Sequence, residues 1–177
     1  NDFYFTDEFV KALYLANLRA GVDYMEFGYK ASKEMFDESK FGKWKFCRDE
    51  HIREIVGENA TDLKIAVMAD VGRCEKTDIL DRADSPIDLI RVATYVNTIP
   101  GAVAMIEDAA KKGYEVSCNI MAISHVREGE LKAALDILAQ TPTDVLYIVD
   151  SYGAMYPEEI ARFVDMYLEV AAKYGKK

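Results

Sequence analysis

The sequence predicts an α/β fold in which a parallel sheet forms part of a (β/α) TIM barrel. Short apolar segments of strand type alternate along the chain with segments of helical spacing, which is typical of a parallel sheet with right-handed crossovers. Each expected strand also carries a polar residue toward its carboxyl end, and in a barrel these ends surround one mouth. A doubly wound open sheet is the alternative, but it would spread these residues along an edge.

Capping residues and apolar spacing predict five helices. Thr6 caps the first helix, whose first turn is acidic and which Gly21 ends. Pro residues suit the first turn of a helix, and Gly residues suit the position after its last turn. The other helices are expected over residues 49–56, from Pro100 to Gly113, from a Ser124 cap to about Gln140, and from Pro157 to near Gly175.

Five apolar segments are expected to be strands: residues 22–30, 63–70, 87–94, 114–122 and 145–151. Five strands cannot close an eight-stranded barrel, which takes about 250 residues. The chain begins with Asn, and both of its ends are predicted helices. We therefore expect strands to be missing on both sides and interpret residues 1–177 as one partial barrel domain.

Composition excludes several classes of partner. The net charge of -9 argues against a nucleic-acid groove or an anionic membrane surface, because phosphates select for clustered Lys and Arg. No apolar run approaches the roughly 20 residues that cross a bilayer, and no signal peptide is recognisable. Cys47, Cys74 and Cys118 are odd in number and far apart. They indicate reduced thiols in a cytoplasmic protein rather than a disulfide framework or a metal site.

Glu26 and Arg91 are the most informative charges, because each stands inside an apolar strand. A charge there is costly unless a partner pairs with it. Arg91 needs a carboxylate, which either Glu26 or a substrate acid could supply. Two alternatives remain open for Glu26. It could be a solvent-exposed residue of an edge strand, or a purely structural partner of Arg91.

Other polar residues give weaker signals. Asp70 and Asp150 end strands, where Asp often caps a turn, but their repetition favours a site. Asn119 could orient a substrate or satisfy strand-end backbone groups. His125 is expected at the barrel mouth, whereas His51 lies in a helix and is expected to be structural. Neither His forms a metal-binding pair, and the sequence has no dinucleotide, P-loop or serine-hydrolase motif.

The chain resembles the DRE-TIM metallolyases, a family that includes 4-hydroxy-2-oxovalerate aldolase, 3-hydroxy-3-methylglutaryl-CoA lyase, and the isopropylmalate and homocitrate synthases. The resemblance is strongest to the aldolase-like branch and extends over essentially the whole chain. The five expected strands would correspond to strands 2 to 6 of the eight-stranded barrel. The resemblance rests on the segments FTDEFVKALYLANLRAGVDYMEFGY, KIAVMADVG, SPIDLIRVATYV, GYEVSCNIMAISH and VDSYGAMYPEEI.

The resemblance implies roles for several of these residues. Glu26 matches the family's second-strand Glu and would hold the first-strand arginine or a metal-bound water. Asp150 and Ser151 match the pair on strand six, and Ser151 would hydrogen-bond the carboxylate of a 2-oxo acid. Arg91 and Asn119 are expected at the same mouth without an established family role. We expect catalysis to involve Glu26, Asp150 and His125, and substrate binding to involve Ser151, Arg91, Asn119 and Asp70.

The family's metal ligands have no counterpart in this sequence. The first-strand Arg-Asp pair would precede Asn1, and the H-x-H pair would follow Lys177. We therefore expect a divalent cofactor, Mn²⁺ or Mg²⁺, in the intact protein, with its ligands outside this chain.

The implied activity is metal-dependent carbon-carbon cleavage, in which a 4-hydroxy-2-oxo acid gives pyruvate and an aldehyde through a stabilised enolate. An acyl-CoA-dependent condensing enzyme of the same family is one alternative. A catalytically incomplete barrel with a binding or structural role is another. The expected partner is a small 2-oxo acid, with neither nucleic acid nor membrane, and a homo-oligomer remains open.

Overall fold

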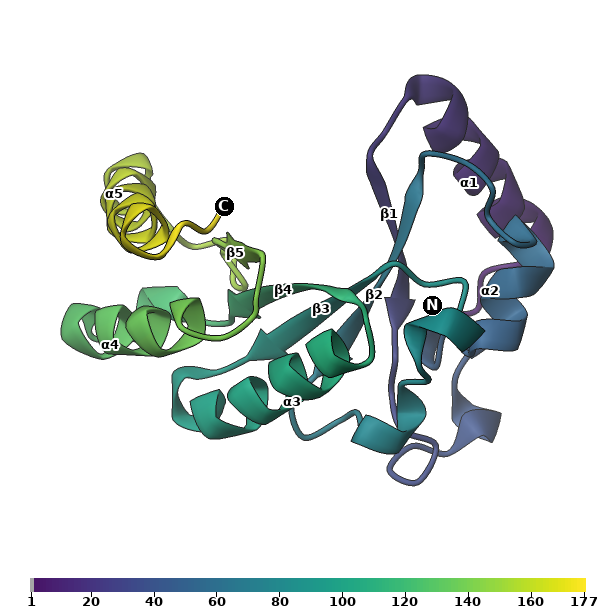
Figure 1. Ribbon diagram of the computed structural model, residues 1–177, viewed down its shortest axis with the longest axis horizontal. Helices are drawn as coiled ribbons and strands as arrows, with labels where there is room; N and C mark the ends of the chain where they lie inside the picture. The colour runs from purple at the N-terminus through teal and green to yellow at the C-terminus, as the bar shows by residue number, and fades with distance from the viewer. Residues whose placement is uncertain (1) are drawn as a thin grey trace.

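The computed structural model describes residues 2–177, which form one parallel sheet of five strands in the order β1-β2-β3-β4-β5 (Figure 1). Every crossover therefore advances by one strand in the same direction, as in a barrel, whereas a doubly wound sheet reverses its order. This confirms the predicted partial barrel. The strands are β1 Tyr24–Tyr29, β2 Lys64–Asp70, β3 Leu89–Thr94, β4 Glu115–Ile120 and β5 Val145–Tyr147.

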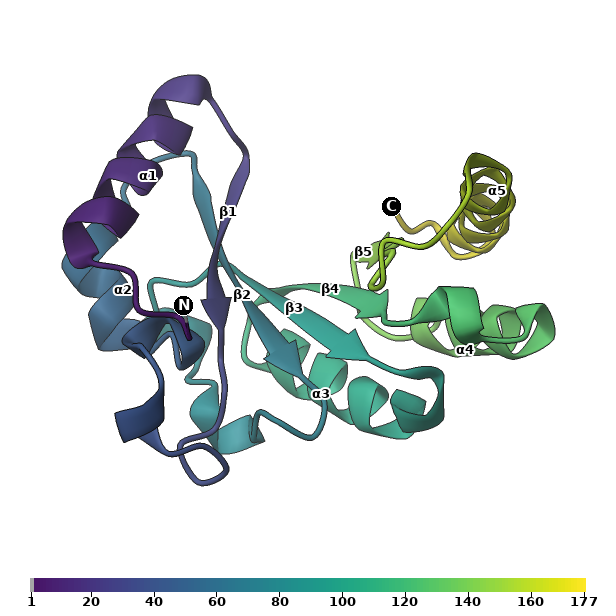
Figure 2. The ribbon, with the colours of Figure 1, turned by 180° about the vertical axis from the view of Figure 1, so that it is seen from behind.

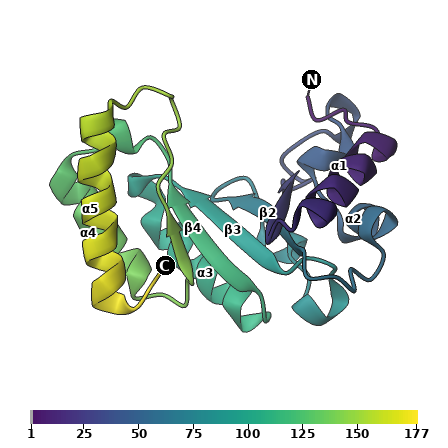
Figure 3. The ribbon, with the colours of Figure 1, turned by 90° about the horizontal axis from the view of Figure 1, so that it is seen from above.

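The helices lie along the outer side of the curved sheet, from α1 and α2 beside β1 to α4 and α5 beside β5 (Figures 2 and 3). Their packing buries alternate strand residues completely, including Ile65, Val67 and Ile90. The hydrophobic core is thus the layer between sheet and helices. The helices are α1 Asp7–Ala20, α2 Asp49–Val56, α3 Ile99–Lys111, α4 Glu128–Ala139 and α5 Pro157–Tyr174.

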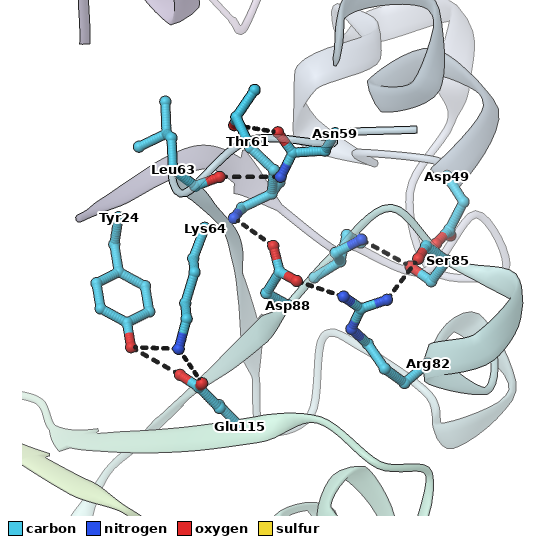
Figure 4. Close-up of polar contacts among 12 residues, drawn as sticks. Tyr24, Asp49, Asn59, Thr61, Leu63, Lys64, Arg82, Ser85, Asp88 and Glu115 are labelled. Carbon is cyan, nitrogen blue, oxygen red and sulfur yellow. Dashed lines mark hydrogen bonds and ion pairs between the residues drawn. The ribbon is translucent and has the colours of Figure 1, made fainter. Parts of the chain in front are cut away.

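The other residues of each strand face the inner side of the sheet, because successive side chains of a strand alternate. At the amino ends of the strands this inner layer is polar. Lys64 forms an ion pair with Glu115, and the Tyr24 hydroxyl donates a 2.7 Å hydrogen bond to Glu115 (Figure 4). The same view shows Asp88, which accepts the Ile65 backbone N–H at 2.8 Å. Charged contacts therefore join the strands at the base of the sheet.

An irregularity in β1 changes which residues face inward. Glu26 pairs with Ala66 of β2, but Tyr29 pairs with Met68, so three steps along β1 match two along β2. Such a bulge re-aims the side chains that follow it. It places Tyr29 level with Met68, on the same side of the sheet as Glu26.

Gly28 lies in this bulge at φ +154°, a region that L residues rarely adopt. A Cβ atom there would lie 2.3 Å from the Trp44 carbonyl oxygen and 3.1 Å from the Cys47 sulfur. Only glycine lets the segment after β1 pack this closely. The bulge therefore depends on this residue.

Several local predictions can be compared with the structure. Thr6 does cap α1, because its side chain accepts the Phe9 N–H at 3.3 Å. The Ser124 cap is wrong: residues Ile123–His125 form a separate 3-10 turn, and α4 begins only at Glu128 after the N-cap residue Arg127. The fifth strand is also shorter than expected, since it ends at Tyr147 and leaves residues 148–151 in the following turn.

The outer edge of β5 is hydrogen-bonded to the last residue. Leu146 donates its N–H to the Lys177 carbonyl at 2.9 Å, and Lys177 donates to the Asp144 carbonyl at 3.2 Å. Lys177 thus lies along β5 in the pattern of a parallel pair. Within residues 2–177, every helix is too short or too polar to traverse a lipid bilayer.

We expect Gly28→Ala to lower the free energy of unfolding by about 3 kcal/mol, because the new methyl group meets backbone at a positive φ. Urea denaturation measures this. Gly129→Ala is the matched control, since Gly129 lies in α4 with open space around it. It should leave stability unchanged or raise it by about 0.5 kcal/mol. Equal effects of the two substitutions would contradict the role given to Gly28.

Candidate functional site

Glu26 and Arg91 form a two-pronged ion pair on the inner side of the sheet. Arg91 Nε and Nη2 each donate a 2.6 Å hydrogen bond to one of the two Glu26 carboxylate oxygens. Arg91 Nη1 donates to the Asn119 side-chain oxygen at 2.9 Å. Three strands, β1, β3 and β4, therefore contribute to one polar cluster. The expected proximity of these three residues is what the structure shows.

The position of this cluster differs from the expectation in one respect. Glu26 and Arg91 are each the third residue of a six-residue strand, so they lie at mid-depth in the sheet rather than at the carboxyl ends. Their side chains are partly exposed, at 32% for Glu26 and 22% for Arg91. The pair is thus accessible from the inner side and is not buried in the core.

Arg91 keeps its charge in this setting. The hydrogen bonds to Glu26 raise the pKa of Arg91 above its usual value, although partial burial opposes this. A guanidinium has five N–H donors. Three of them are used by Glu26 and Asn119, which leaves two for a ligand. The Glu26 carboxylate offsets the Arg91 charge, so the cluster offers an anion two N–H donors rather than a net positive charge.

A cavity of about 270 Å³ lies beside the pair. It is open toward the inner side, so a small organic acid can enter it. Ala66 of β2 contributes to its lining, as do Ile148 and Val149 of the segment that follows β5. The lining residues are Tyr24, Glu26, Ala66, Leu89, Arg91, Tyr147, Ile148 and Val149.

Asp150 organises the turn after β5. Its Oδ2 accepts the Met155 N–H at 2.9 Å, and this bond, with further backbone amides of the turn, holds the pKa of Asp150 below its usual value. Next to it, Ser151 Oγ accepts the Ala122 N–H at 3.0 Å. Because a hydroxyl that accepts one bond can still donate its hydrogen, Ser151 remains able to bind an oxygen of a ligand.

His125 lies in the turn after β4, exposed, with its ring edge-to-face against Tyr152 at 4.9 Å between centroids. The turns after β4 and β5 therefore meet, as the prediction of a shared mouth requires. Among residues 2–177, however, His125 and Asp150 make no hydrogen bond or ion pair with the Glu26 and Arg91 cluster. The predicted site residues therefore lie in two separate groups, whereas the sequence predicted a single site.

Asp70 is the last residue of β2 and is 7% exposed. Burial raises the pKa of its carboxyl group. Its Oδ2 lies 3.5 Å from Arg73 Nη1, whereas Oδ1 has no hydrogen-bond partner within residues 2–177. Asp70 borders a second cavity, of about 230 Å³, together with Arg73 and Lys45. Sequence reasoning missed both of these cations, because each follows a strand in an irregular loop.

The residues present do not fit a divalent-metal site by themselves. Within residues 2–177, no three His, Cys, Asp or Glu side chains are grouped as ligands. Both oxygens of Glu26 are engaged by Arg91, and Asp70 lies against Arg73. A metal-binding carboxylate would have to exchange these partners for the ion.

Two curated proteins are similar to the chain over most of its length. It is 26% identical over 167 residues to an oxaloacetate decarboxylase of Mycobacterium tuberculosis, covering 93% of this chain and 48% of that protein. It is 28% identical over 163 residues to 4-hydroxy-2-oxovalerate aldolase 1 of Rhodococcus erythropolis, covering 91% of this chain and 46% of that protein. The chain thus spans about half the length of these relatives. No protein-family model matches it.

A crystal structure supports the fold. The N-terminal domain of a candidate aldolase from Bacteroides vulgatus superposes with a TM-score of 0.78 at 24% identity, covering 93% of this chain and 55% of that one. With the two curated relatives, this likeness supports the resemblance to the aldolase-like branch of the DRE-TIM metallolyases.

A double-mutant cycle tests the energetic link between Glu26 and Arg91. We expect Glu26→Gln and Arg91→Gln to show a coupling of about 1–3 kcal/mol in urea denaturation, because charged hydrogen bonds in a partly buried setting are lost together. The exposed pair Lys132 and Glu169 serves as the control. Its cycle should give about 0.5 kcal/mol or less. Indistinguishable couplings would show that the inner pair is no stronger than a surface pair.

Proposed function

We propose that this chain forms part of a lyase that cleaves the carbon-carbon bond beta to the oxo group of a 2-oxo acid and releases pyruvate. The observation that carries the proposal is the Glu26, Arg91 and Asn119 cluster beside an open cavity on the inner side of a partial barrel. Barrel enzymes build their sites from residues contributed by several different strands. The names of both curated relatives describe cleavage of such acids.

Arg91 would supply N–H donors to the negative charge that develops in the reaction. Cleavage beside a 2-oxo acid leaves an enolate, and fixed donors aimed at the developing negative charge lower the barrier. Two N–H groups of Arg91 remain for this purpose after its bonds to Glu26 and Asn119. Glu26 would act as a positioning residue, because its two oxygens fix the plane of the guanidinium.

Ser151 would bind the substrate's carboxylate by donating its hydroxyl hydrogen. The Ala122 N–H holds Ser151 Oγ in place, and the backbone bonds to Asp150 shape the turn that carries it. Asp150 would therefore position Ser151. His125 is exposed near the same turn and is the candidate base for the substrate's hydroxyl proton.

Two leaving groups are compatible with this chemistry. A 4-hydroxy-2-oxo acid loses its hydroxyl proton and releases an aldehyde, and the remaining enolate takes up a proton to become pyruvate. A 2-oxo acid that carries a second carboxylate on C3, as oxaloacetate does, releases CO₂ and leaves the same enolate. We place the aldehyde-releasing reaction first, on the resemblance to the aldolase-like branch. An acyl-CoA condensation ranks below both, because the relatives' names describe neither an acyl-CoA substrate nor a condensation.

Glu26→Gln tests the role of the pair. In the full-length protein supplied with Mn²⁺, we expect kcat for pyruvate release from a 4-hydroxy-2-oxo acid to fall about 10²-fold or more, because Arg91 loses its fixed orientation. Circular dichroism should show an unchanged fold. The panel of substrates should include oxaloacetate, with aldehyde and CO₂ measured separately. Turnover equal to that of the parent enzyme would refute the role of Glu26.

Ser151→Ala should act mainly on binding. We expect KM for the 2-oxo acid to rise about tenfold with a smaller change in kcat, since one charge-assisted hydrogen bond to the carboxylate is lost. Steady-state kinetics measure both constants. Ser39→Ala is a suitable control, because Ser39 lies on an exposed turn and its hydroxyl donates a 2.7 Å hydrogen bond to Asp37. A KM that does not differ between the two variants would remove Ser151 from the site.

A further inference from the structure

The 230 Å³ cavity between the carboxyl ends of β1 and β2 and the loop that follows β1 is a second candidate binding site. Two cations line it, Lys45 from that loop and Arg73 from the loop after β2. Asp70 is the only carboxylate that residues 2–177 contribute to the lining. The wall is otherwise aromatic and apolar, formed by Phe3, Tyr29, Ala31, Phe36 and Met68.

Aromatic rings hold the Lys45 ammonium in place. Its nitrogen lies 3.8 Å from the ring centroid of Phe41, 4.2 Å from that of Phe36 and 5.3 Å from that of Phe3. Within residues 2–177 it donates no hydrogen bond and forms no ion pair. A cation between ring faces is stabilised, but its N–H donors stay available. The charge is thus fixed in position and still open to an anion.

The two cations of this cavity repel each other. Burial lowers the pKa of Lys45, and the nearby Arg73 lowers it further, against a smaller opposing effect of Asp2. Arg73 has a side chain that is 62% exposed and lies only loosely against Asp70, at 3.5 Å. An anion between Lys45 and Arg73 would relieve this repulsion and give both side chains a charged partner.

Tyr29 connects this cavity to the Glu26 and Arg91 cluster. Burial raises the pKa of its phenol, Asp70 and Glu26 raise it further, and Arg91 and Arg73 lower it. Tyr29 lines the cavity and faces the same side of the sheet as Glu26, so the cavity and the cluster lie on one side of the sheet. The β1 bulge is what turns Tyr29 to this side of the sheet.

We propose that Lys45 and Arg73 bind a second carboxylate of the substrate, at the end remote from its 2-oxo acid group. This inference rests on the proposed function and narrows it to dicarboxylic oxo acids. Asp70 lies beside Arg73 at the cavity, and its Oδ1, which has no hydrogen-bond partner within residues 2–177, can accept a hydrogen bond from a donor on the ligand. The aromatic wall contacts the apolar carbons next to the carboxylate.

Calorimetric titration of the full-length protein tests the site without requiring turnover. The probes are glutarate, its monoamide glutaramate and inorganic phosphate, at matched ionic strength. We expect glutarate to bind about tenfold or more tightly than glutaramate, the size expected for one charge-assisted contact. Equal affinities would overturn the proposal. Tighter binding of phosphate than of glutarate would also overturn it, because the site would then select phosphorylated ligands.

Three variants assign the effect to the cavity. Arg73→Gln and Lys45→Gln should each weaken glutarate binding about tenfold. Arg73 has a largely exposed side chain, so its variant tests the site even where loss of Lys45 disturbs the aromatic cluster. Lys33→Gln is the control, because Lys33 is exposed on the same loop and lies outside this cavity. An equal loss in the Lys33 variant would indicate general charge attraction and overturn the proposal.

The outcome separates this inference from the proposed lyase. Unchanged turnover in Glu26→Gln counts against the lyase role and leaves glutarate binding unaffected. Absence of glutarate selectivity counts against the second carboxylate and leaves cleavage of monocarboxylic oxo acids standing.

Discussion

The ion pair between Glu26 and Arg91 is the contact on which the inner side of this sheet depends. Its partners come from β1 and β3, so they meet across β2, which lies between those strands. This is sterically feasible because Ala66, the residue level with Glu26, has a small side chain. A larger residue there would fill the cavity and separate the charges. With Asn119 of β4, the pair thus connects three strands on the inner side of the sheet.

The two sides of the sheet follow different physical rules. Toward the helices, complete burial of Ile65, Val67 and Ile90 provides the hydrophobic stabilisation. Toward the inner side, ion pairs and hydrogen bonds connect the strands, from Lys64 and Glu115 at the base to Glu26 and Arg91 above. Exposed ion pairs add little stability. Apart from the partly buried pair of Glu26 and Arg91, the ion pairs of the inner layer therefore contribute mainly geometry.

The sequence allowed the fold to be predicted because its signals are local or periodic. Short apolar segments marked all five strands, and Thr6 and Gly21 marked the two ends of α1 through their own backbone chemistry. The prediction that Ser124 caps a helix was wrong because a capping residue suits any turn, and here the chain makes a 3-10 turn before α4. Tyr147 ends the fifth strand early for a related reason: the apolar residues after it line a cavity rather than continue the sheet.

The site was predictable only in part. Glu26 and Arg91 were found because charges inside apolar strands require partners. The depth of the pair was missed, since apolar runs do not fix strand ends to within a residue or two. Lys45 and Arg73 could not be found, because their proximity depends on how two irregular loops fold over the strand ends. The sequence around Lys45, with aromatic residues at positions 36 and 41, was the one available signal.

The bulge at Gly28 also limits how this protein can change in length. Beyond it, Tyr29 faces the cavity, while Lys30 is buried beside Asp49 on α2. Deleting one residue of the bulge would leave two steps on each strand, so simple alternation would return while Tyr29 and Lys30 kept their sides of the sheet. Deleting two would exchange them, which would turn the Lys30 amine inward and leave the Asp49 carboxylate without this partner. Viable deletions at this point of the chain should therefore remove one residue rather than two.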